Sequence, residues 1–394
     1  MDNHPAPFGG IFLFMDTPLK RIHFLDIMRG VAVVVMVMGH TIDAVLEREL
    51  HSSDLFRLYD AFRGFTAPTF LFVSGFAYAV ATHKRWNDFR SFSKPLIKRL
   101  QRIALLFLVG YALHFPFFSF VRIVHEAQAD QLAQMFQADV LHCVGASLLI
   151  LHALILLHAS QRTFVRTLAA LTATIVLASP IVWSIDFAPI VSPMLSPYFN
   201  QMQPSIFPLF PFAGFLFAGV IVGVLFLNAR QEGREDPFLR TFGVAAIGGL
   251  LGGLVLEAIP VSFYPPHDFW KSSPNWFVIR LGIVSLVSLG FYALRRLPAA
   301  VERGLVTLGQ TSLLIYTVHL MIAYGSPINH GLMQKVGQTL AVHHAIGVGL
   351  AVLAAMVVLT YAWQYLREHH FVPARVLQAG LASTMLYSFF LQPW

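Results

Sequence analysis

The chain has 394 residues, of which 56% are hydrophobic and 12% are charged, and its mean hydropathy is +0.65. Because soluble globular domains carry about 25% charged residues, this composition excludes a soluble protein and predicts one whose surface largely faces lipid. The net charge of +7 predicts no nucleic-acid partner, because Lys and Arg lie between long hydrophobic runs, where membrane topology explains them.

Three segments are expected along the chain. Residues 1–20 hold a short apolar patch with no basic stretch ahead of it, which is not typical of a signal peptide, and they are interpreted as an N-terminal tail. Residues 21–366 are predicted to form one membrane-embedded domain. Residues 367–394 are expected to add a further span or an interfacial helix. The single cysteine, Cys143, excludes an intrachain disulfide and a cysteine-built metal site.

Hydrophobic runs of spanning length predict an all-α polytopic membrane bundle of about 10–11 transmembrane helices, at roughly 20 residues a span. The expected spans are 24–46, 62–82, 101–121, 139–158, 163–184, 206–228, 240–262, 276–295, 305–326, 341–366 and, more weakly, 376–392. The connections between them are short, so the sequence predicts no soluble domain. The expected location is an integral, multi-pass membrane protein, in the inner membrane if the source is a prokaryote.

The distribution of Lys and Arg predicts the orientation of these spans. The N-terminal tail and the even-numbered loops carry 19 of these residues, whereas the odd-numbered loops carry six. Because cytoplasmic loops are enriched in positive charge, the N-terminus is expected to be cytoplasmic.

Ionisable residues in the first span are the leading functional candidates, because charges are costly inside a bilayer. Arg29 and His40 are eleven positions apart, about three helical turns, so they share a face about 16 Å apart along the axis. Asp26 and Asp43 lie three residues outside them on the same broad stripe. The alternatives are structural roles. Asp26 and Arg29 would form an ion pair at a helix end, and His40 would be a hydrogen-bonded histidine of the core.

A second candidate site lies at the start of the third span, where Arg99 and Arg102 share one face of the helix. The loop that precedes it is the most basic in the chain. The planar guanidinium group of arginine can donate two parallel hydrogen bonds to a phosphate. These residues are therefore candidates to bind a phosphorylated donor such as an acyl-CoA. Ordinary positive-inside charge is the competing explanation.

These residues resemble the signature of the transmembrane acyltransferase superfamily, which includes the acyltransferase-3 proteins. The shared features are the Arg29–His40 spacing, the Arg99–Arg102 pair and the FLFVSGF run of the second span. Other stretches are similar to the branch that contains heparan-alpha-glucosaminide N-acetyltransferase. They are TAPTFLFVSGF, DVLHCVGASLL (Asp139–Leu149), PLFPFAGFLFAGVIVG (Pro208–Gly223) and GQTSLLIYTVHL (Gly309–Leu320).

The resemblance implies an enzyme that moves an acyl group, expected to be acetyl, from acetyl-CoA or another acyl-CoA to a hydroxyl or amine. The acceptor is expected to be a glycan or another small molecule at the extracytoplasmic side. No metal is expected, because the histidine pairs near the C-terminus lack helical ligand spacing with acids. The other expected partner is the lipid bilayer, and the formation of a homo-oligomer is left open.

The resemblance leaves two candidates for the catalytic base. The heparan-modifying branch tends to have Asn where His40 stands, and its histidine falls in the following segment, where His51 lies in this chain. We favour His40, because its spacing from Arg29 matches the acyltransferase-3 pattern and because Asp43 is placed to orient it. Arg29, Asp43 and His51 accompany His40 in the expected catalytic set.

Further polar residues are expected to bind substrate. By topology Arg63, His142 and His319 lie toward the outer half of the membrane, and Asp26 joins them as a candidate. Each one alone is more typical of a hydrogen-bonded packing group.

Two functions from other classes remain as alternatives. One is a secondary transporter or proton-coupled exporter that uses Asp26, Arg29 and His40 as a relay, although the sequence shows no internal repeat of the kind common in transporters. The other is a receptor-like or structural membrane protein without catalysis, against which the intact Arg29–His40 spacing argues.

Overall fold

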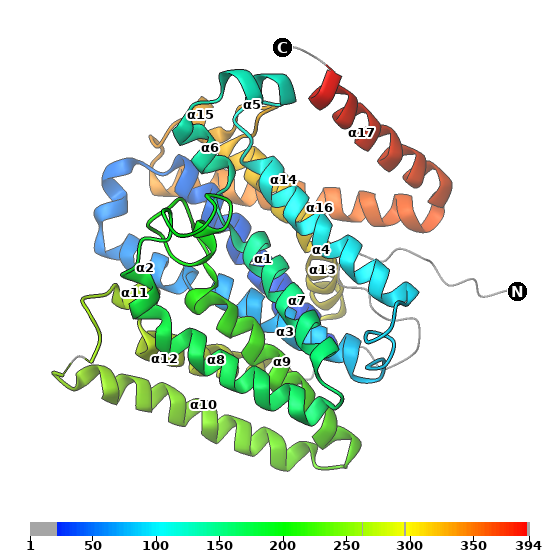
Figure 1. Ribbon diagram of the computed structural model, residues 1–394. Coiled ribbons are helices and arrows are strands. Elements are labelled where there is room, and N and C mark those ends of the chain that lie inside the picture. The colour runs from blue at the N-terminus through cyan, green and yellow to red at the C-terminus, as the bar shows by residue number, and fades with distance from the viewer. Residues whose placement is uncertain (1–21, 262, 295–296, 392–394) are drawn as a thin grey trace, which may run out of the picture. The chain divides into compact units, whose positions relative to one another are not determined.

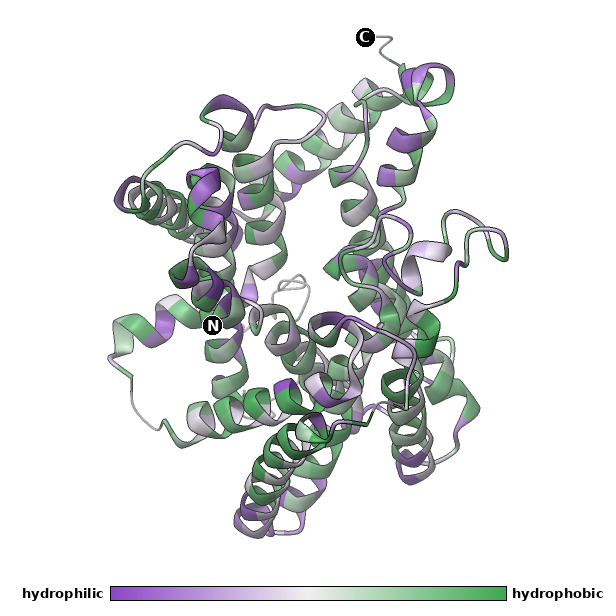
Figure 2. Cartoon of the chain, turned by 90° about the vertical axis from the view of Figure 1, so that its left-hand side faces the viewer, coloured by the Kyte–Doolittle hydropathy of each residue, from purple (hydrophilic) through white to green (hydrophobic). Residues whose placement is uncertain are grey.

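The computed structural model describes residues 22–261, 263–294 and 297–391. The tail expected at 1–20 therefore lies outside the described residues. Within them the chain forms helices joined by turns and loops, with isolated bridges but no strand (Figure 1). Hydrophobic residues cover most of the length of the long helices (Figure 2). The all-α class expected from the sequence is confirmed.

The first of two compact units contains residues 22–29, 64–110 and the described part of 137–298. It holds the start of α1 (His23–Val45), α3 (Thr66–His83), α4 (Lys94–Leu113) as far as Gly110, α7 (Val140–Leu157), α8 (Gln161–Trp183), the 3-10 turn η2 (Ser196–Tyr198), α9 (Leu209–Gln231), α10 (Glu235–Ala258), α11 (Phe269–Ser272) and α12 (Pro274–Ala293).

Glycines bring α3 and α9 into direct backbone contact in this unit. A Cβ atom on Gly75 would lie 1.9 Å from the carbonyl oxygen of Leu216, and one on Gly219 would lie 2.0 Å from that of Phe72. Small residues allow membrane helices to approach in this way. The glycines of the FLFVSGF and AGFLFAGVIVG stretches therefore serve a helix–helix contact.

The second unit contains residues 30–63, 111–136 and 299–391. It holds the larger part of α1, the 3-10 turn η1 (Arg48–Ser52), α2 (Asp54–Arg63), α5 (Phe120–Glu126), α6 (Ala129–Met135), α13 (Ala299–Gln310), α14 (Ser312–Tyr324), α15 (Leu332–Lys335), α16 (Val342–His369) and α17 (Phe371–Leu391).

In the second unit α1 packs against helices that follow it by more than 250 residues. Val33 and Val37 share a buried cluster with Ile315 of α14 and with α16. A Cβ atom on Gly30 would lie 2.1 Å from the carbonyl oxygen of Leu305 in α13. The backbones of α1 and α13 are therefore in contact at Gly30, and this contact helps to fix the position of α1 within the unit.

Eight helices among the described residues are long and apolar enough to cross a membrane, or nine if the bent pair α13–α14 counts as one span. This supports an integral multi-pass membrane protein. The span expected at 101–121 differs most from the structure, because α4 begins at Lys94 and ends at Leu113. Pro116 follows three residues later, and residues just ahead of a proline are disfavoured in the helical conformation.

The span expected at 305–326 is broken into two helices that are bent by 79°. The break falls at Thr311, whose hydroxyl donates to the carbonyl of Thr307 at 2.9 Å and lies 3.3 Å from the hydroxyl of Thr360. Threonine hydroxyls that bond to the preceding turn bend helices. Because of the break, α14 begins as a separate helix seven residues before His319.

Candidate functional site

A pair of histidines joins α1 and α14 inside the second unit. His40 Nδ1 lies 2.9 Å from His319 Nε2, and the two rings are parallel to within 3°. His319 is fully buried at 0% exposure, whereas His40 is only half-buried. The contact connects residues 279 positions apart in the sequence.

The hydrogen bonds around this pair assign the ring protons. His319 Nδ1 lies 2.6 Å from the carbonyl oxygen of Ile315, and a carbonyl can only accept, so Nδ1 carries the hydrogen. In the neutral ring Nε2 of His319 is then an acceptor, and it takes the hydrogen of His40 Nδ1. His40 is therefore left with an unprotonated Nε2, to which no described residue donates a hydrogen bond. This is the arrangement of an oriented general base.

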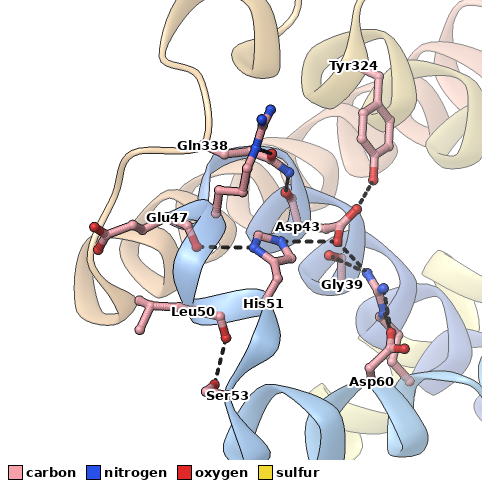
Figure 3. A network of polar contacts seen from close by, with 11 residues as sticks. Gly39, Asp43, Glu47, Leu50, His51, Ser53, Asp60, Tyr324 and Gln338 are labelled. Atoms are coloured by element: carbon pink, nitrogen blue, oxygen red, sulfur yellow. Dashed lines mark hydrogen bonds and ion pairs between the residues drawn. The ribbon is translucent and has the colours of Figure 1, made fainter.

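The carboxylate of Asp43 is the centre of a second polar network, one turn further along α1 (Figure 3). Tyr324, the last residue of α14, donates its hydroxyl hydrogen to Asp43 Oδ2 at 3.0 Å. Oδ1 lies 3.6 Å from Arg63 NH1 and 3.5 Å from His51 Nε2. The side-chain amide of Gln338 donates to the backbone carbonyl of Asp43 at 3.0 Å. Four separate segments of the unit therefore meet at this one residue.

Asp43 does not orient His40 in the way that the sequence suggested. Its contacts go to Tyr324, Arg63 and His51, and the partner of the His40 ring is His319. Three residues on a helix place two side chains on the same broad face, but the carboxylate of Asp43 is engaged by residues of other segments, and spacing along α1 does not show this.

His51, the other candidate base, directs both of its ring nitrogens into this network, but only Nδ1 makes a hydrogen bond there. Nδ1 lies 3.1 Å from the carbonyl oxygen of Glu47, to which it donates, and Nε2 faces Asp43 Oδ1. Its ring is also held against Phe56, with 4.4 Å between the ring centroids. In this structure His51 therefore supports the turn between α1 and α2. Its Nε2 is buried and faces the carboxylate of Asp43, whereas Nε2 of the half-buried His40 makes no hydrogen bond or ion pair with a described residue.

Arg63 ends α2 and faces two carboxylates. Its Nε and NH2 groups donate to Asp60 Oδ1 at 2.9 and 2.6 Å, and NH1 donates to the carbonyl oxygen of Gly39 at 3.2 Å. The bond to Gly39 ties Arg63 to the residue that precedes His40. Of the expected substrate-binding residues, Arg63 and His319 thus lie in this cluster with His40, Asp43 and His51.

Three further residues of this cluster were not predicted from the sequence: Tyr324, Asp60 and Gln338. Tyr324 follows the YTVHL stretch and precedes Gly325, whose φ of 87° ends the helix. The only sequence signal for Tyr324 is its position at a glycine-terminated helix end that follows the candidate histidine His319. Gln338 lies in a loop that no pattern connects to the first span.

Arg29 and Asp26 belong to the first unit and form the ion pair that the structural alternative predicts. Arg29 NH1 lies 3.5 Å from Asp26 Oδ1, and Arg29 is 1% exposed. The pair spans three residues at the start of α1, where a carboxylate also complements the helix dipole.

The two arginines expected to hold the donor have different surroundings. Arg99 is buried, donates through NH2 to the hydroxyl of Thr82 at 2.8 Å, and stacks its guanidinium on Tyr78 and Phe89 at 4.3 and 3.4 Å from their ring centroids. Arg102 is half-buried, one turn further along α4. Arg99 is therefore part of the packing between α3, α4 and the loop between them, and Arg102 is the more accessible of the two.

His142 has a local structural role in the first unit. Its Nδ1 lies 2.8 Å from Asp139 Oδ1 and 3.2 Å from the backbone nitrogen of Asp139, while Asp139 accepts hydrogen bonds from the backbone of Leu141 and His142. This is a capping box at the N-terminus of α7. A Cβ atom on Gly110 of α4 would lie 2.5 Å from the His142 ring, so the imidazole fills the space beside that glycine.

The family model described as "Heparan-alpha-glucosaminide N-acetyltransferase, catalytic" matches residues 21–252, which is more than half of the chain. The match contains His40, Asp43, His51, Arg63, Arg99 and His142, and it ends before His319 and Tyr324. A comparison with curated proteins gives no match.

Proposed function

Since this chain belongs to the heparan-alpha-glucosaminide N-acetyltransferase catalytic family and is a membrane acetyltransferase, we propose that it transfers acetyl from acetyl-CoA to a sugar. The acceptor atom is a hydroxyl or amine, and the acceptor is presented from the extracytoplasmic side. Family membership supports the reaction class, and the ring geometry of His40 and His319 supports the choice of base.

The observation that carries the proposal is the open Nε2 of His40. His319 holds the Nδ1 hydrogen of His40, so Nε2 is the nitrogen that removes a proton from the acceptor. The acceptor oxygen or nitrogen forms a bond to the thioester carbonyl carbon, the carbon–sulfur bond breaks, and the CoA thiolate takes the proton from His40. In the competing route the acetyl group first forms a bond to His40 Nε2 and is then transferred to the acceptor.

The direct test is acetyl transfer by the purified protein in detergent. We expect turnover of radiolabelled acetyl-CoA in the presence of an amino sugar or a hydroxyl sugar from a glycan panel, and turnover lower by about 10²–10⁴-fold with His40→Ala. Incubation without an acceptor distinguishes the two routes: label retained by the wild type and absent from His40→Ala would refute direct transfer. Full activity of His40→Ala would exclude both routes.

The phosphates of the donor are assigned to Arg99 and Arg102 at the cytoplasmic end of α4. The exposure of Arg102 supports it as the direct contact, and the stacking of Arg99 supports a positioning role. Arg102→Glu should raise the dissociation constant for CoA about tenfold or more, because a charge-assisted bond is replaced by repulsion. Arg90→Glu, a reversal at an exposed arginine of the preceding loop, is the matched control. Equal CoA binding by both variants and the wild type would contradict the assignment.

A proton-coupled exporter is the second candidate function, and the broken span α13–α14 is the observation that favours it, because discontinuous helices are common in transporters. In sealed proteoliposomes an exporter moves an intact solute, whereas the acetyltransferase produces free CoA and acetylated acceptor. Solute transport without CoA release would support the exporter and contradict the enzyme.

A further inference from the structure

The second unit contains a cavity that the proposed chemistry does not use. It has a volume of about 490 Å³ and lies between the segment leading into α5, the turn after α14 and the end of α17. Its lining residues are Pro116, Phe117, Phe118, Ser119, Arg122, Pro327, Ile328 and Ser388. This volume is within the range of about 300–1,000 Å³ that is usual for small-molecule sites. We call it the α5 cavity.

The walls of the α5 cavity are held in place by contacts that do not depend on a ligand. Asn329 closes the turn that carries Pro327 and Ile328, through backbone bonds with Ser326 at 2.9 and 3.1 Å and a side-chain bond to the carbonyl of Met321 at 2.8 Å. On the other side, Phe389 of α17 stacks on Phe115 at 5.1 Å and lies 5.7 Å from Phe118. The cavity is therefore part of the folded unit.

Arg122 supplies the positive charge of the cavity. Its guanidinium lies over Phe117 at 4.1 Å from the ring centroid, and its Nε donates to Glu126 Oε2 at 2.8 Å. No described residue accepts a hydrogen bond from its NH1 or NH2 group, and none accepts from the hydroxyl of Ser388. Guanidinium nitrogens without an acceptor, together with a serine hydroxyl in the same cavity, can donate hydrogen bonds to an oxyanion such as a phosphate.

The position of α17 indicates where such an anion comes from. The helix exposes apolar side chains along its length, among them Val376, Leu381 and Met385, as expected of a helix that faces lipid. Its last turn carries Ser388, which lines the cavity, and two phenylalanines that pack against Phe118 and Phe120. An apolar helix that faces lipid and ends beside an arginine can accommodate an amphiphile whose chains follow the helix and whose anionic group meets the guanidinium.

We propose that the α5 cavity binds the anionic headgroup of a membrane phospholipid, with the hydrocarbon chains lying along α17. Arg122 and Ser388 hold the phosphate, while Phe117, Phe118 and Ile328 contact the glycerol and the first methylene groups. This site is distinct from His40 and does not require the acetyl transfer to be correct.

The test uses thermal unfolding of the full-length protein in detergent, followed by tryptophan fluorescence. Added phosphatidylglycerol should raise the unfolding midpoint by several degrees, and phosphatidylcholine should raise it by less than half as much. Arg122→Gln should remove the difference between the two lipids. Arg57→Gln changes an exposed arginine of the same unit that also pairs with an acid, and it should retain the difference.

Glu126→Gln should change the affinity for phosphatidylglycerol in the opposite direction. It removes the carboxylate that partly neutralises Arg122, so phosphatidylglycerol should give the same shift at a lower concentration. An unchanged lipid difference in Arg122→Gln would overturn the proposal. An equal stabilisation by inorganic phosphate or glucuronate would also overturn it, because the ligand would then be a soluble anion.

Discussion

Each unit of the molecule contains a fully buried imidazole, His319 in the second and His142 in the first. His142 bonds to Asp139, three residues away, and both residues cap the helix that they begin. His319 bonds to its own helix through Nδ1 and to His40, 279 residues away, through Nε2. Burial is the same in the two cases. What differs is that the second arrangement fixes the tautomer of another side chain and leaves that side chain with an open nitrogen.

Replacement of His40 should give the largest effect on catalysis. His40→Ala removes the open Nε2, so turnover should fall by about 10²–10⁴-fold, measured as kcat for acetyl transfer. The affinity for CoA, measured by equilibrium binding, should remain within a factor of two. A loss of CoA binding that accounts for the whole loss of activity would place His40 in donor binding instead.

His319 should have the next largest effect, because it acts through His40. In His319→Ala the Nδ1 hydrogen of His40 has lost its acceptor, so the productive tautomer is no longer favoured, and kcat should fall by about 10–10²-fold with little change in KM. His319→Gln provides a carbonyl oxygen as acceptor and should recover part of the loss. The pH profile of kcat should change in His319→Ala, which a purely structural loss would not cause.

His51 tests the choice between the two candidate bases. Because its nitrogens face Glu47 and Asp43, His51→Ala should lower kcat by less than about tenfold, through loosening of the turn at the end of α1. A loss as large as that of His40→Ala, with CoA binding intact, would make His51 the base, as in the heparan-modifying branch that the sequence resembles.

His142 completes the comparison, with the smallest expected effect on turnover. His142→Ala removes a helix cap and leaves a cavity, so the free energy of unfolding should fall by about 1–3 kcal/mol. The kcat per folded molecule should stay within about twofold of the wild type. Gly110→Ala, which would place a Cβ 2.5 Å from the same ring, should also lower the thermal midpoint without a specific loss of kcat.

Hydrophobic runs of spanning length predicted most of the long helices, because length and apolarity are properties of each segment alone. The break at Thr311 was not predicted, since a hydropathy average does not register a hydroxyl that bonds to the preceding turn. His40 was identified because an ionisable side chain within a span is energetically costly and is therefore a functional candidate. Its partner was not, because spacing along one helix carries no information about a contact with α14.

Charge patterns predicted the candidate arginines but not their surroundings. Arg99 and Arg102 were expected to act together, yet one is enclosed by aromatic rings and the other is half-exposed. Three positions on a helix place two side chains on the same broad face, but the neighbouring elements decide which of them is covered. The loop residue Phe89 covers Arg99. A periodic sequence pattern does not predict where a loop residue lies.

The contact between Gly30 and the carbonyl of Leu305 has a consequence for how the protein tolerates genetic variation. Gly30 lies ten residues from His40 on the same helix and touches neither histidine. A single methyl group there would collide with backbone, which cannot rotate away as a side chain does, so α1 would have to shift as a whole and carry His40 away from His319. Gly30→Ala should therefore lower activity in a random screen, and a method that scores function without structure would mistake Gly30 for a catalytic residue.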